Sequence, residues 1–139
     1  FRHLEYTDGR GFVDEDSKIR AFSLLSRLSK AKAVQNPLLK IICDLPEQHA
    51  EYVEPTETEL NELRKMLQAA ISNWGSLRNI SVRAFVKYWI DREGLLAQEK
   101  DKFSLIVSRA TGDILLDFMS WNYAMVKYPW MQKPIVVEW

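Results

Sequence analysis

The chain has few of the residues that build covalent or metal-based frameworks. Its 139 residues include one cysteine, Cys43, and two histidines, His3 and His49. A single cysteine excludes an intramolecular disulfide and a cysteine-based zinc site. Neither histidine has a second histidine or a suitably spaced carboxylate nearby, which a metal site would need. We therefore expect no metal and no cofactor, and folding has to rest on a hydrophobic core.

Net charge and long apolar runs are also lacking. The 19 basic and 19 acidic residues cancel, so charge gives no reason to expect nucleic acid or an anionic membrane as a partner. The longest apolar runs, such as 41–43, are far too short to cross a bilayer. We predict neither nucleic-acid binding nor direct membrane insertion. With 47% hydrophobic residues, the chain has the composition and length of one ordinary globular domain.

The chain is predicted to be organised as one domain after a short irregular start. Residues 1–13 show little periodicity, which is typical of a lead-in from a longer chain. Residues 14–139 are then expected to form a single C-terminal domain. It would comprise a helical part at 14–97 and a β-containing aromatic tail at 101–139.

Two helices are predicted at the beginning of the helical part. An acidic cluster at 14–16, followed by apolar residues at spacings of three, indicates a helix at about 15–29. Asn36 as N-cap and Pro37 in the first turn indicate a second, short helix that ends before Pro46. This second helix is apolar nearly all round, so we expect it to be buried.

Two further helices have clearer start and stop signals. Residues 56–59 match the capping-box pattern, and apolar residues follow at helical spacing as far as Trp74. Ser81 can cap another such run that includes Trp89, with Gly94 as the left-handed residue after its end. We expect Trp74 and Trp89 to lie in one hydrophobic core.

The last third of the chain changes from helical to strand periodicity. Residues 103–107 alternate with a period of two, which predicts a strand. A short helix is predicted at 113–118, and two segments at 123–128 and 135–139 have the β-branched and aromatic residues of further strands. The predicted fold class is α+β and mainly helical, with about four helices followed by a small C-terminal antiparallel sheet.

Candidate catalytic groups are few, and each has a simpler structural interpretation. Cys43 and His49 could act as nucleophile and base, but the thiol lies in an apolar helix and the histidine in a polar segment typical of a solvated loop. Asp113 and Asp117 would share a helix face, yet we favour a capping role for Asp113 over acid–base chemistry. We predict no catalytic residue, and a cysteine-dependent hydrolase is disfavoured.

The end of the chain is aromatic, whereas chain ends are usually polar. About half of these aromatic residues are expected in the core, because alternate side chains of a strand point inward. The others should face a protein partner, since a short hairpin cannot hide both of its faces and exposed Trp, Tyr and Met are enriched in interfaces. The candidate partner-binding residues are Trp121, Tyr123, Tyr128, Pro129, Trp130, Met131 and Trp139.

The same tail carries a family resemblance. The runs at 128–131 (Tyr-Pro-Trp-Met), 133–134 (Lys-Pro) and 137–139 (Val-Glu-Trp) closely resemble the C-terminal signature of contractile injection system tape measure proteins. Segments upstream, including 72–79 and 91–95, resemble family positions in the same order. The resemblance covers nearly the whole chain, and we expect the long portion that sets tube length in the family to lie outside it.

The resemblance implies a structural protein of a bacterial phage-tail-like particle. This domain would be the C-terminal anchor of the tape measure protein at the tube and spike-hub end of the baseplate, while the full-length protein sets inner-tube length. The implied partners are the inner-tube and spike or hub proteins, with self-association as a trimer. The protein would occupy the bacterial cytoplasm during assembly and then the lumen of the inner tube. The alternative is a helical adaptor or chaperone-like module that binds another particle component or cargo.

Overall fold

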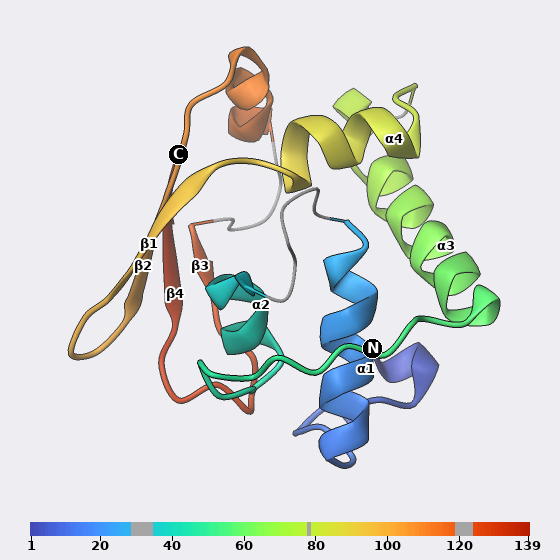
Figure 1. Cartoon of the computed structure of the whole chain (residues 1–139). Coiled ribbons are helices and arrows are strands. Elements are labelled where there is room, and N and C mark those ends of the chain that lie inside the picture. The colour runs from blue at the N-terminus through green and yellow to red at the C-terminus, as the bar shows by residue number, and fades with distance from the viewer. Residues whose placement is uncertain (29–34, 78, 119–123) are drawn as a thin grey trace. The chain divides into compact units, whose positions relative to one another are not determined.

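The computed structural model describes residues 1–28, 35–77, 79–118 and 124–139 (Figure 1). Helices precede strands along the chain, and four of the described segments form strands of one sheet. This order confirms the predicted α+β class.

The chain divides into two compact units. The first unit comprises Phe1–Leu63 and Tyr128–Gln132, and the second comprises Arg64–Lys127 and Lys133–Trp139. The tail therefore leaves the second unit, contributes a short segment to the first, and returns to the second.

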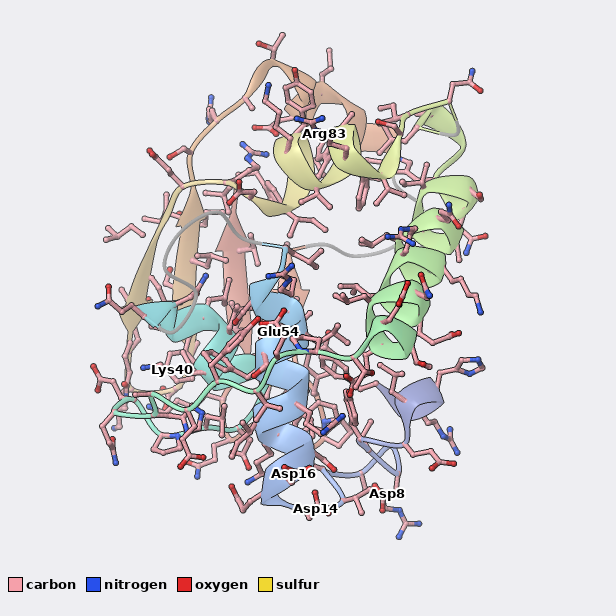
Figure 2. All side chains as sticks on the ribbon, turned by 45° about the vertical axis from the view of Figure 1, so that its right-hand side comes forward. Asp8, Asp14, Asp16, Lys40, Glu54 and Arg83 are labelled. Atoms are coloured by element: carbon pink, nitrogen blue, oxygen red, sulfur yellow. The ribbon has the colours of Figure 1, made fainter. Side chains whose placement is uncertain are left out.

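Helix α1 (Glu15–Ser26) belongs to the first unit and begins where the acidic cluster predicted. The side chain of Asp14 accepts a hydrogen bond of 2.7 Å from the backbone N–H of Ser17. Figure 2 shows Asp14 and Asp16 at this end of the helix, where the free N–H groups favour negative charge. The fully or almost fully buried apolar side chains of α1 are Ala21, Phe22 and Leu24.

Helix α2 (Pro37–Ile42) begins as predicted at Asn36, which accepts hydrogen bonds from two backbone N–H groups of the first turn. The prediction that this helix is buried is wrong. Its apolar side chains are only half-buried, and its buried residue is Lys40, labelled in Figure 2. The Lys40 ammonium donates to the carbonyl of Glu47, so its charge has an acceptor while its methylene stem covers apolar surface.

Helix α3 (Glu57–Asn73) starts with the predicted capping box and crosses from the first unit into the second. The backbone N–H of Glu59 donates to the Thr56 hydroxyl at 3.3 Å, and the backbone N–H of Thr56 donates to the Glu59 carboxylate at 2.6 Å. The helix ends ahead of the short 3-10 turn Gly75–Leu77. None of the described helices is long and apolar enough to cross a membrane.

Helix α4 (Val82–Phe85) is shorter than the periodicity predicts, because the chain continues as a π-helix over Val86–Ile90. Ser81 caps its start as expected, accepting a hydrogen bond of 3.2 Å from the backbone N–H of Ala84. The prediction that Gly94 is a left-handed residue after the helix is wrong. Gly94 is the first residue of strand β1.

The sheet lies in the second unit and consists of β1 (Gly94–Gln98), β2 (Phe103–Val107), β3 (Met125–Val126) and β4 (Ile135–Glu138) in the order β1-β2-β4-β3. Pairs β1–β2 and β3–β4 are antiparallel, as expected, whereas β2 and β4 are parallel, so the sheet is mixed. Sequence analysis missed β1, because it contains no β-branched or aromatic residue to indicate a strand.

The core of the second unit combines helical residues with a 3-10 segment at Thr111–Phe118, where the short helix was predicted. The rings of Trp74 and Trp89 lie 4.7 Å apart at 60°. This contact confirms that both tryptophans belong to one core. Its buried members are Ile71, Trp74, Leu77, Phe85 and Leu116, with Trp89 and Trp139 packed against them.

Candidate partner-binding site

The corner at 128–131, which lies in the first unit, is built around Trp130. The indole Nε1 of Trp130 donates a hydrogen bond of 2.9 Å to the backbone carbonyl of Ile42, at the end of α2. On the N-terminal segment, the ring of Phe12 lies 5.0 Å from the Trp130 ring. The Tyr128 ring stacks on Trp130 at 5.0 Å and 8°. Trp130 is therefore held by segments far away in the sequence, and it supports Tyr128.

Met131 lies on the buried side of the corner. Its side chain is 6% exposed, its backbone N–H donates to the Tyr128 carbonyl at 3.0 Å, and its sulfur accepts from the Tyr128 N–H at 3.3 Å. Pro129 is exposed, and so is Tyr128, with 40% of its surface accessible. The corner thus has a packed side, formed by Trp130 and Met131, and an open side, formed by Tyr128 and Pro129.

The remaining candidate residues do not join this corner. Trp139 belongs to the second unit, where it packs against the core and lies 5.4 Å below the guanidinium of Arg92. Trp121 and Tyr123 lie outside the residues that the structure describes. The structure therefore brings together only the four consecutive residues 128–131.

Asp113 does not cap the start of a helix as predicted, because it is the third residue of the 3-10 segment Thr111–Phe118 and its side chain reaches back to the residue before that segment. It also has an ion-pair partner that sequence analysis missed. Its carboxylate accepts a hydrogen bond of 2.8 Å from the backbone N–H of Ala110. Arg92 binds both of its oxygens and also donates to the carbonyl of Ser108. The bond to Arg92, followed by that to Ala110, lowers the pKa of Asp113. A carboxylate held in this way is an acceptor, not a proton donor. The side chain of Asp117 is not described.

The environment of Cys43 is unsuited to nucleophilic chemistry. The thiol is fully buried, and burial raises its pKa to about 12. It is therefore protonated at neutral pH, whereas the thiolate is the nucleophile. We expected His49 to be a solvated loop residue, but it is half-buried. Its ring packs edge-on against buried Phe22 at 5.5 Å. Its Nε2 lies 3.0 Å from the carbonyl of Glu51.

Among the described residues, no group of three or more His, Cys, Asp or Glu side chains could hold a metal ion. A charged cluster in the first unit is centred on Glu59, which accepts hydrogen bonds from Tyr6, Thr56 and Arg20. These partners come from three separate segments of the first unit. The cluster ties the N-terminal segment and α1 to the start of α3, which is a structural role.

The model of the family described as "Contractile injection system tape measure protein" matches residues 1–139. This chain belongs to that family. The match covers the whole chain, including the corner at 128–131. Neither the comparison with curated proteins nor that with solved structures found a match.

Membership places this chain in a family of structural proteins, the tape measure proteins of contractile injection systems. Two observations at the candidate catalytic residues agree with a structural role. The thiol of Cys43 is buried and protonated, and the carboxylate of Asp113 forms an ion pair with Arg92. Sequence analysis missed three contacts: those of Phe12 and Ile42 with Trp130, and that of Arg92 with Asp113. No local pattern pairs these residues, because each pair is far apart in the sequence.

Proposed function

We propose that this domain is the C-terminal anchor of the tape measure protein at the spike-hub end of the inner tube, and that the open side of the corner binds a hub or inner-tube protein. The full-length protein would set tube length, starting from this attachment. Assembly would take place in the bacterial cytoplasm. The observation that carries the proposal is that Tyr128 and Pro129 are exposed while Trp130 beneath them is held by Phe12 and Ile42.

The corner is suited to binding because its residues have little conformational freedom left to lose when a partner binds. Pro129 restricts its own backbone and biases Tyr128 toward an extended conformation. The stack on Trp130 restricts the Tyr128 side chain as well. A preorganised contact residue reduces the entropic cost of association. Tyrosine also combines a large apolar ring with a hydroxyl, which is why it is enriched in protein interfaces.

The test is Tyr128→Ala in the full-length protein, with intact particles counted by electron microscopy. We expect the variant domain to keep its circular dichroism spectrum while particle number falls, consistent with a loss of at least about 2 kcal/mol in binding for a central contact. Tyr88→Ala is the matched control, since Tyr88 is 57% exposed and lies outside the corner. Normal particle numbers with Tyr128→Ala would rule out the corner as the anchor.

A further inference from the structure

The free edge of strand β1 is a second candidate for protein recognition, and it does not depend on the anchor role. We propose that this edge binds an extended segment of another protein, apolar at its centre and carrying a Lys or Arg opposite Glu93. The segment would add a strand to the sheet. Recognition would combine backbone hydrogen bonds with contacts to alternate side chains.

The register of the β1–β2 hairpin defines which backbone groups are available. The carbonyl of Glu93 accepts from the N–H of Ser108 at 2.9 Å, and the N–H of Glu99 donates to the carbonyl of Lys102 at 2.9 Å. In an antiparallel pair, alternate residues direct both backbone groups to the partner strand. Leu95 and Ala97 therefore also face β2, and the residues that direct N–H and C=O to the free edge are Gly94, Leu96 and Gln98.

These outward groups have no partner among the described residues. Strand β1 is at the end of the sheet order and its sole neighbour there is β2. No backbone hydrogen bond from another described segment reaches Gly94, Leu96 or Gln98. Within the part of the chain that the structure describes, the edge is thus open over the length of the strand.

Within β1 itself, the edge also lacks the features that usually prevent strand pairing. Protected edges carry charges, prolines or bulges, but β1 reads Gly-Leu-Leu-Ala-Gln, and its pairing with β2 runs through five consecutive residue pairs without interruption. On the face beside the edge, Leu95 is 67% exposed and lies opposite Ile106, which is 48% exposed. An incoming strand would cover part of this apolar pair.

Charge favours a different protein over a second copy of this chain. Glu93 is exposed, and on the same face Glu99 lies 3.5 Å from Lys102. Antiparallel pairing of two copies about Leu96 is the register in which all three outward residues of both strands form pairs, and it would place Glu93 opposite the Glu99 of the copy. Like charges directly opposite each other are destabilising. A Lys or Arg of another protein opposite Glu93 would give an attractive charge pair in place of this repulsion.

The experiment uses the 139-residue chain and the synthetic peptide acetyl-Lys-Thr-Val-Thr-Val-Thr-Lys-amide. Its lysines and valines share one face, so a lysine meets Glu93 in either strand direction. We expect the peptide to slow amide hydrogen exchange at Gly94, Leu96 and Gln98, whereas Leu95 and Ala97 are already protected. A peptide with Glu in place of both Lys residues should bind at least about tenfold more weakly.

The matched variants are Leu96→Pro and Leu96→Ala. Proline removes an N–H that points outward, so the β1–β2 ladder is retained, and it obstructs an incoming strand. We expect Leu96→Pro to weaken peptide binding at least about tenfold and Leu96→Ala to change it less than about threefold, with exchange protection at Leu95 and Ala97 as the check of folding.

Three results would overturn the inference. The first is no slowing of exchange at the three outward amides under saturating peptide. The second is equal binding of the acidic and basic peptides. The third is protection of the same amides without peptide that increases with protein concentration, which would identify a second copy as the occupant.

Discussion

At the scale of single residues, Glu59 connects several segments of the first unit. Its carboxylate accepts from the Tyr6 hydroxyl, from the Thr56 hydroxyl at 2.8 Å, and from two guanidinium nitrogens of Arg20 at 2.8 and 3.0 Å. Buried carboxylates are tolerated when they are paired and hydrogen-bonded in this way. The side chain therefore joins three segments of the first unit, and removing any partner leaves part of it unsatisfied.

Tyr6→Phe tests this connection by removing one hydroxyl. We expect a loss of about 1–3 kcal/mol in the free energy of unfolding, because a buried acceptor loses a donor. Burial, and then the bond to Glu59, raise the pKa of Tyr6 to about 12, which agrees with a hydroxyl that acts as donor. Denaturant titration measures the effect, and Tyr88→Phe, at an exposed tyrosine, is the control. Equal stability of both variants would contradict the role of Tyr6.

The acid stability of the protein should reflect the same cluster. Burial alone would raise the pKa of Glu59, but the hydrogen bonds from Tyr6, Thr56 and Arg20 lower it from 4.5 to about 2. A lowered pKa means that the ionised group stabilises the fold above its ordinary pKa, and that this contribution is lost as the pH falls from 4.5 toward about 2.

We expect the wild-type protein to lose on the order of 2 kcal/mol from Glu59 across that window. Glu59→Gln cannot ionise, so its free energy of unfolding should fall less steeply with acid over the same range. Urea titrations at several pH values measure both slopes. Identical slopes for the two proteins would show that Glu59 does not contribute.

At the scale of elements, the β1–β2 hairpin depends on a close backbone approach at Gly94. A Cβ atom added there would lie 2.9 Å from the carbonyl oxygen of Ile106 and 3.4 Å from a methyl carbon of Leu105. The nearest atom belongs to the backbone, which cannot rotate away as a flexible side chain can. Glycine is therefore required by strand pairing and not by the end of a helix.

Gly94→Ala should destabilise the second unit by about 1–3 kcal/mol, since the hairpin has to shift to admit a methyl group. Gly11→Ala is the matched control, because nothing lies within 4 Å of a Cβ at that position. We expect the control to change stability by less than about 0.5 kcal/mol. Equal loss of stability in Gly94→Ala and Gly11→Ala, measured by denaturant titration, would contradict the close approach at Gly94.

At the scale of the whole molecule, the tail connects the two units by residues that are close in sequence. Lys127 belongs to the second unit, Tyr128–Gln132 to the first, and Lys133 to the second again. Within the first unit, Trp130 makes the contacts that hold this segment. The family signature at 128–131 therefore includes a residue with a structural task of its own.

Trp130→Ala should lower the stability of the first unit by about 3 kcal/mol, the loss typical of a packed tryptophan. Trp130→Phe keeps a ring beside Phe12 but loses the hydrogen bond to Ile42, so about 1 kcal/mol is expected. Hydrogen exchange of α1 amides reports the first unit, and that of β2 amides reports the second. Unchanged hydrogen exchange of the α1 amides in Trp130→Ala would show that Trp130 does not stabilise the first unit.

The sequence by itself determined the features whose causes are local. The helix starts at Asp14, Asn36, Thr56 and Ser81 were predictable, because each is a contact between a side chain and a backbone N–H at most three residues away. The strand at Phe103–Val107 was predictable because alternation along one strand needs no knowledge of its neighbours. The residues at 128–131 indicated the family because a run of consecutive residues can be recognised in the sequence alone.

Tertiary structure alone decided the features that join distant residues. The parallel pairing of β2 with β4, the bond between Arg92 and Asp113, and the bond between Trp130 and Ile42 link residues 21 to 88 positions apart or separate strands of the sheet. No local preference encodes such partners, because their energy appears only once packing has brought them together. The same holds for the open edge of β1, since a strand is at an edge only by its place among the others.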